Sequence, residues 1–87
     1  MKDLDQLRRQ TEQALIDFLN VDLDLCFTLL NLARHEEGEG LKKLFRKAQN
    51  GLATVRSFER RVADPQASYR IHLRADELEQ LLAEFRL

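Results

Sequence analysis

The sequence predicts an all-α protein: a three-helix antiparallel bundle with a long first helix, assembled as a homodimer with coiled-coil-like packing. The chain is rich in straight-chain residues that favour helices, namely Leu, Ala, Glu, Gln, Arg and Lys. Its helix breakers fall in two places, Gly38-Glu39-Gly40 and Asp64-Pro65. In the three segments that these breakers separate, apolar residues recur at steps of three and four. We therefore expect one domain, 1–87, with helices over about 3–37, 39–63 and 66–86.

The first expected helix carries one long apolar seam and ends before a glycine. Gly38 lies just past the apolar pattern and suits the left-handed position that follows a helix. At about 1.5 Å per residue this helix would be roughly 50 Å long, too long for its two neighbours. Its first turns should therefore project from the bundle or lie on another molecule. The seam consists of Leu4, Leu7, Thr11, Ala14, Phe18, Val21, Leu25, Thr28 and Leu32.

The second and third expected helices each carry one apolar stripe. In the second, the stripe continues in phase through Asn50-Gly51, so we expect one unbroken helix. Ala48 and Gly51 form a thin patch there, where another helix could approach closely. In the third, Asp64 should be the N-cap and Pro65 the first helical residue, where its missing N–H does no harm.

Residues 14–33 are unusually apolar for a helix at a protein surface. Fourteen of these residues are apolar, and on a helix they cover roughly 240° of the circumference. A surface helix needs an apolar stripe of only about 100° or somewhat more. A second face therefore remains, which either packs inside a deeply nested helix or meets a partner, most simply a second copy of the chain. This candidate interface consists of Ile16, Leu19, Leu23, Phe27 and Leu30.

Asp22 is an acid within the apolar arc of the same helix. An isolated buried carboxylate is costly, so its side chain should be paired or lie near an edge. We expect an ion pair with Arg56 or with another arginine of residues 39–63. A functional role as an acid of perturbed pKa is the alternative.

The charges are distributed unevenly although the net charge is only −1. Residues 1–37 carry a net −4 and residues 38–64 a net +4. The basic residues can complement the acidic first helix, or they can form a face for an anion or a nucleic acid. No helix-turn-helix, zinc knuckle or aromatic platform accompanies them, so the nucleic-acid interpretation is the weaker one. The candidate basic face consists of Lys42, Lys43, Arg46, Lys47, Arg56 and Arg60.

The sequence lacks the patterns that catalysis, metals and cofactors require. Cys26 is the only cysteine, and His35 and His72 are the only histidines, too few for a zinc site. No glycine-rich phosphate loop follows Gly38-Glu39-Gly40. We expect no enzyme, no metal and no cofactor, but a small interaction or structural protein that binds itself or another helical protein through the first helix. The alternative is an anion- or nucleic-acid-binding accessory protein that uses residues 39–63.

The expected location is the cytoplasm, with no insertion into a membrane. The residues after Met1 do not form an apolar leader, and a lone cysteine fits a reducing compartment. No run approaches the roughly 18 uninterrupted apolar residues of a membrane-spanning helix.

Overall fold

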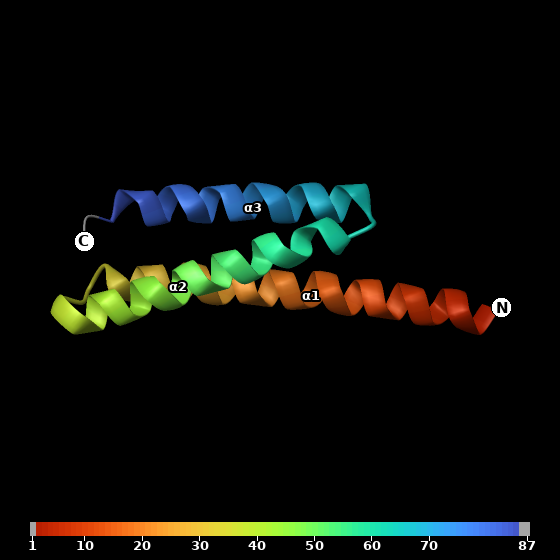
Figure 1. Ribbon diagram of the computed structural model, residues 1–87, viewed down its shortest axis with the longest axis horizontal. Helices are drawn as coiled ribbons and strands as arrows, with labels where there is room; N and C mark the ends of the chain where they lie inside the picture. The colour runs from red at the N-terminus through yellow and green to blue at the C-terminus, as the bar shows by residue number, and fades with distance from the viewer. Residues whose placement is uncertain (1, 86–87) are drawn as a thin grey trace.

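The computed structural model describes residues 2–85 and shows three long helices joined by short connections. They are α1 (Lys2–Ala33), α2 (Gly38–Phe58) and α3 (Pro65–Glu84), with a short 3₁₀ helix, η1 (Glu59–Arg61), between the last two. In Figure 1, α1 runs from right to left, α2 returns to the right, and α3 runs to the left again. The prediction of an all-α fold with three helices is confirmed for the described residues.

The helix ends differ from the sequence expectation in three places. α1 ends at Ala33, four residues before the expected end, and Gly38 instead begins α2 with a φ of +61°. α2 runs unbroken through Asn50-Gly51 as expected, but it ends at Phe58 and tightens into η1 instead of continuing to residue 63. Residue 86, the expected end of the third helix, lies outside the described residues.

The start of α3 agrees with the sequence expectation. The Asp64 carboxylate accepts a hydrogen bond of 3.1 Å from the backbone N–H of Gln66, and Pro65 occupies the first helical position. The cap satisfies one of the backbone N–H groups that a helix start leaves unpaired. The chain therefore turns sharply between η1 and α3.

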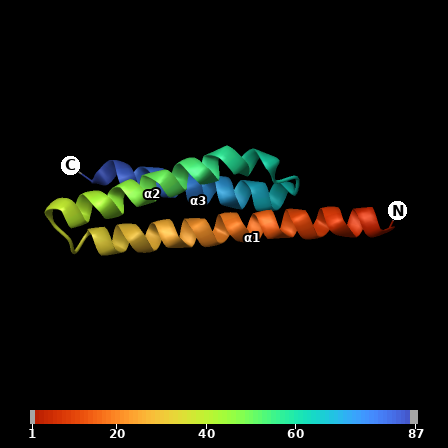
Figure 2. The same cartoon turned by 60° about the horizontal axis from the view of Figure 1, so that its bottom comes forward.

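The N-terminal part of α1 extends beyond the other two helices, as expected from its length. Figures 1 and 2 both show it projecting past the turn between α2 and α3. Glu12 marks the place where the turn meets α1, because its carboxylate accepts hydrogen bonds from the backbone N–H groups of Ala63 and Asp64. Residues 3–11 of α1 are exposed, beyond the ends of α2 and α3 (Figures 1 and 2).

One core fills the space between the three helices. Its largest fully buried side chains come from all of them, and a close approach between α1 and α2 lies at its centre. A Cβ atom built on Gly51 would lie 2.2 Å from Sγ of Cys26, so only glycine fits there. The largest fully buried side chains are Leu19, Leu23, Cys26 and Leu30 of α1, Val55 of α2, and Ile71 and Leu78 of α3.

Candidate interaction surface

The structure reverses the roles of the two apolar faces of α1. The face expected to meet a partner lies inside the protomer: Leu19, Leu23 and Leu30 are 0–1% exposed. Ile16 and Phe27 are partly buried against the same core. The candidate interface drawn from the sequence was therefore wrong, because this face packs on α2 and α3 of the same chain.

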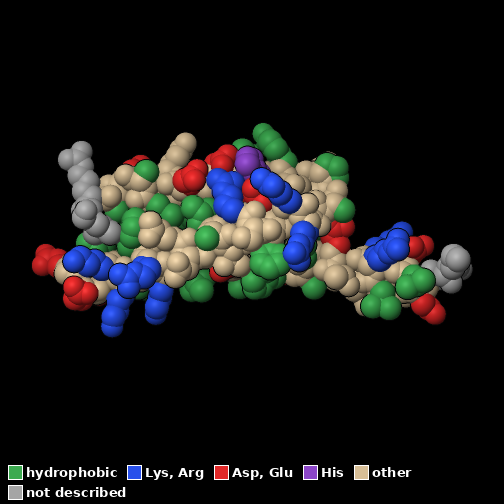
Figure 3. Space-filling model, viewed as in Figure 1, with side chains coloured by type: hydrophobic (Ala, Val, Ile, Leu, Met, Phe, Trp, Pro, Cys, Tyr) green, Lys and Arg blue, Asp and Glu red, His purple; other side chains and the backbone are tan. Residues whose placement is uncertain are grey.

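The seam expected to form the core lies instead on the outside. Its six largest side chains are each 51–66% exposed, and they repeat along the length of α1. Figure 3 shows hydrophobic side chains along the lower edge of the molecule, over α1, and on its projecting end. We call this surface the α1 row, and it consists of Leu4, Leu7, Phe18, Val21, Leu25 and Leu32, with the smaller Thr11, Ala14 and Thr28 at the intervening positions.

The α1 row has the spacing of a coiled-coil seam. Its members alternate steps of three and four from Leu4 to Leu32 without interruption, which is a repeat of seven residues. Other large exposed apolar side chains among the described residues, Tyr69 and Leu73 of α3, form no such series. Isolated apolar side chains are normal on a protein surface, but a continuous row marks a contact surface.

A groove lies beside the projecting end of the α1 row. Its volume is about 390 Å³, and Leu4, Leu7 and Leu15 supply much of its apolar wall. Arg61, from η1, closes the groove at the point where the turn approaches α1. The groove is thus an apolar recess whose margin carries Arg8, Glu12 and Arg61.

Two sets of contacts hold the margins of the α1 row in place. On one side, Arg74 of α3 donates hydrogen bonds to the Asn20 side chain, at 3.0 Å, and to the Asp24 carboxylate. On the other side, the Phe18 ring meets the Phe58 ring edge-on, with centroids 6.4 Å apart. These contacts fix the orientation of α1 in the protomer, and therefore the direction in which the row faces.

Asp22 lies at the edge of the α1 row without the expected arginine. Its Oδ2 atom is buried and has no hydrogen-bond partner, and burial raises the pKa of the carboxyl group. The expected ion pair with Arg56 is wrong, because Arg56 lies on the side of α2 that faces α3. Burial, and then the nearby Asp22 charge, raise the pKa of the Cys26 thiol to about 11. A thiol with such a pKa is a poor nucleophile at neutral pH.

Arg56 is the centre of a polar cluster between α2 and α3. Its guanidinium donates to Asp76 at 2.6 Å and also lies 3.4 Å from Glu59 and 3.6 Å from Glu79. The hydrogen bond from Arg56 lowers the pKa of the Asp76 carboxyl and raises that of Arg56 itself. His72 lies within 3.4 Å of Glu59 and Asp76. The cluster sets one arginine and His72 against three carboxylates, and its ion pairs with Asp76 and Glu79 join α3 to α2.

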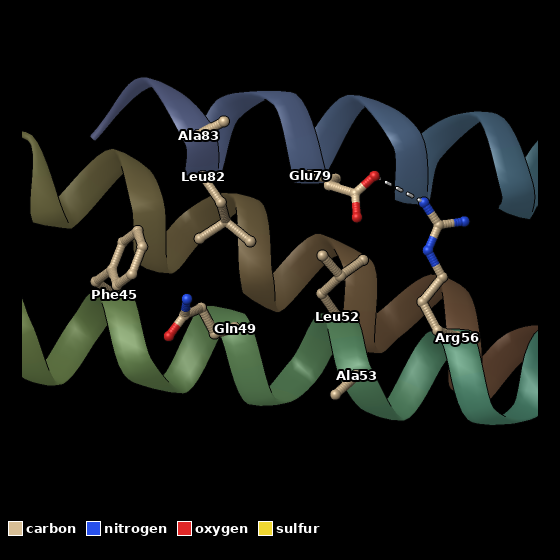
Figure 4. Close-up of a pocket in the computed structure, with 8 residues that line it drawn as sticks. All are labelled: Phe45, Gln49, Leu52, Ala53, Arg56, Glu79, Leu82 and Ala83. Carbon is tan, nitrogen blue, oxygen red and sulfur yellow. Dashed lines mark ion pairs between the residues drawn. The ribbon is translucent and has the colours of Figure 1, made fainter. Parts of the chain in front are cut away.

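The groove beside this cluster is shallow and mostly apolar. Figure 4 shows side chains of α2 and α3 on its two sides, with α1 behind them, and the ion pair of Arg56 with Glu79 at one end. Its volume is about 540 Å³. Phe45, Leu52 and Leu82 supply the apolar part of the lining. No nucleophile is paired with a base in this groove.

The candidate basic face is divided by the structure. Lys42, Lys43, Arg46 and Lys47 are exposed on the first turns of α2, where Lys42 lies 3.8 Å from Glu39. Arg56 does not belong to this face, because it is committed to the carboxylates described above. Arg60 is exposed on η1, far along the chain from the lysines. Only the four residues near the start of α2 form a compact basic patch.

The described residues contain no group of three or more His, Cys, Asp or Glu side chains that could hold a metal ion. No helix among residues 2–85 has a stretch long and apolar enough to cross a membrane. Comparisons with protein-family models, with curated proteins and with solved structures find no match to this chain. The α1 row, which no element of residues 2–85 covers, is the strongest candidate for a functional site.

Proposed function

We propose that this protein is a non-enzymatic interaction module, in which three helices form one antiparallel bundle that binds a helical partner through the α1 row. The single observation that carries the proposal is the uninterrupted exposure of this row, from Leu4 to Leu32, in a chain whose other α1 face is fully used by the core. The partner is a second copy of the chain or another protein with an apolar helix face.

The cost of leaving the row in water supports the proposal. Each of its six large side chains leaves about 100 Å² exposed, and apolar surface is worth about 25 cal/mol per Å² on burial. Burying the whole row against a partner would therefore gain roughly 15 kcal/mol on this side alone, before the costs of association are subtracted. A seven-residue repeat is the pattern that lets two helices maintain contact over such a length.

A capture experiment with matched variants tests the proposal. The tagged wild-type chain, Leu25→Glu and Asn31→Glu are incubated with an extract of the source cells that also contains the untagged chain. Both substitutions add one charge to an exposed position of α1, but only Leu25 belongs to the row. We expect the wild type and Asn31→Glu to retain the same proteins, and Leu25→Glu to lose them. Retention of the same proteins by all three chains contradicts the proposal.

A second candidate function uses the basic patch of α2. Four exposed cations on two helical turns could attract a phosphate-bearing ligand, and an oligonucleotide is the simplest probe. If this function holds, binding of a labelled oligonucleotide measured by anisotropy should weaken steeply with salt, and Lys43→Gln/Lys47→Gln should reduce that dependence. The absence of binding at low salt removes this candidate and leaves the α1 row unaffected.

A further inference from the structure

We propose that the partner of the α1 row is the α1 row of a second copy of this chain, which runs in the opposite direction with its Val21 against Phe18 of the first copy. This inference rests on the proposed function and names the occupant of the same surface. The arguments for it are the match of side-chain sizes, the match of lengths, and the area that the two rows would bury.

The side-chain sizes fit an antiparallel pair better than a parallel one. In the antiparallel register Phe18 faces Val21 and Ala14 faces Leu25, so at these two central levels the larger side chain lies opposite the smaller one. In a parallel pair Phe18 would face Phe18 and Ala14 would face Ala14, which crowds one level and leaves a gap at the next. Interdigitation of large and small residues is what fills an interface at the density of a protein interior. The register also pairs Thr11 with Thr28, and Leu7 with Leu32.

The lengths also match, because the register places the projecting end of α1 on the other copy. Within the protomer residues 3–11 are exposed, and the groove of about 390 Å³ lies beside Leu7. In the antiparallel pair Leu32 of the second copy lies opposite Leu7 and can enter this groove. The two rows then face each other from Leu7 to Leu32, and Leu4 lies opposite residue 35, just past the end of α1 at Ala33.

The area is sufficient for a stable pair. The six large side chains of the α1 row are each 51–66% exposed. Each therefore leaves about 100 Å² of solvent-accessible area that a partner could cover. Complete coverage of both rows would bury at most about 1,200 Å², which is the lower limit for specific protein–protein interfaces before the flanking residues are counted.

The charges at the margin are compatible with this register. Asp17 of one copy approaches Asp24 of the other, but Asp24 is already bound to Arg74. The guanidinium of Arg74 can therefore lie near both carboxylates, and no bare pair of like charges results. Antiparallel helices also place the opposite ends of their dipoles side by side, which is the favourable arrangement.

Sedimentation of the purified full-length chain tests the occupant. We expect a monomer that becomes a dimer as concentration rises through the micromolar range, with a dissociation constant raised at least about 100-fold by Leu25→Glu and unchanged by Asn31→Glu. A purified wild type that stays monomeric to millimolar concentration overturns the inference. The capture experiment then decides separately whether the row binds another protein.

Cross-linking between two single-cysteine chains tests the direction. Leu7→Cys and Leu32→Cys are each combined with Cys26→Ala, which gives two single-cysteine chains. A second pair of chains retains the buried Cys26 and replaces the first pair if Cys26→Ala impairs folding. On mixing and mild oxidation we expect a disulfide between positions 7 and 32, identified by mass spectrometry of the linked peptides. Asn31→Cys, which is off the row, replaces Leu32→Cys as the control and should not link. Disulfides joining position 7 to position 7 and position 32 to position 32, or a dimer that forms no link, overturn the inference while the proposed function stands.

Discussion

Substitution of Gly51 by alanine should destabilise the protein, against the usual effect of this change in a helix. In an exposed helix interior, alanine is more favourable than glycine by about 1 kcal/mol. At Gly51, however, the new Cβ atom would lie 2.2 Å from Sγ of Cys26 and 3.6 Å from Oδ1 of Asp22. Carbon and sulfur atoms in contact normally lie at least about 3.5 Å apart, so either the buried Cys26 side chain must move within the core or α1 and α2 must separate.

The size of the effect follows from the two opposing terms. Overpacking a core costs about 1–3 kcal/mol, and the depth of this overlap places the cost at the upper end. After the gain in helix propensity, we expect Gly51→Ala to lower the free energy of unfolding by about 1–2 kcal/mol. In a domain of this size the midpoint of thermal unfolding should fall by roughly 5–15 °C.

A double-mutant cycle with Cys26→Ala separates the steric cause from other effects. Removal of Sγ leaves space for the new methyl group, so Gly51→Ala should stabilise the Cys26→Ala chain by up to about 1 kcal/mol. The coupling between the two sites should then be about 2–3 kcal/mol. Gly40→Ala is the matched control, because its Cβ would lie 3.1 Å from the flexible Glu36 carboxylate and should cost little.

The assay is thermal and urea unfolding followed by circular dichroism, with every chain at the same concentration because association shifts the midpoint. A Gly51→Ala chain that is more stable than the wild type would refute the reasoning. So would equal effects of Gly51→Ala with and without Cys26, because the two helices would then not approach as closely as the structure shows.

Three further predictions follow from the burial of α1 side chains. Because burial raises the pKa of Asp22, the folded chain binds this proton more tightly than the unfolded chain, and stability is lost as pH rises through the folded pKa. Asp22→Asn should therefore be more stable than the wild type at pH 7 in urea titrations, by a margin that shrinks toward acidic pH; a margin that grows toward acidic pH would contradict this sign. Cys26, with a pKa of about 11, should react with a thiol reagent at pH 8 far more slowly in the folded chain than in urea, and equal rates would show that the thiol is accessible. Leu23→Ala should cost about 3–5 kcal/mol of stability in the same titrations, whereas Leu25→Ala should cost under about 1 kcal/mol at concentrations where the chain is monomeric; similar losses would mean that the two faces of α1 are equally buried.

The elements that sequence could predict are those set by local chemistry. The cap at Asp64 and the proline that follows it define the start of α3 in the sequence and in the structure alike. The continuity of α2 through Gly51 also follows from the phase of its apolar residues. The end of α1 was less predictable, because residues 34–37 are compatible with a helix and only the turn toward Gly38 stops it at Ala33.

The orientation of α1 could not be predicted from periodicity, because two apolar faces with helical spacing compete for one core. A signal was nevertheless present in the size of the side chains. Cys26 and Ala33 are small and buried on the face that packs inward, and Ala48 and Gly51 are small residues of α2 at the same contact. The close approach at Gly51 leaves room only for a short side chain on α1, and Cys26 supplies it on the inward face. The partners of Arg56 depended on this orientation and were missed with it.

The central claim is that the α1 row is the surface through which this chain associates, and the three valines provide a direct test. Val21 is in the row and 66% exposed, whereas Val55 and Val62 are 0% and 6% exposed in the core. In methyl NMR spectra of a valine-labelled chain, recorded from low micromolar to millimolar concentration, the Val21 signals should shift as the chain associates, and those of Val55 and Val62 should stay in place. Val21 signals that remain constant over this range, or shifts confined to the core valines, would contradict the account.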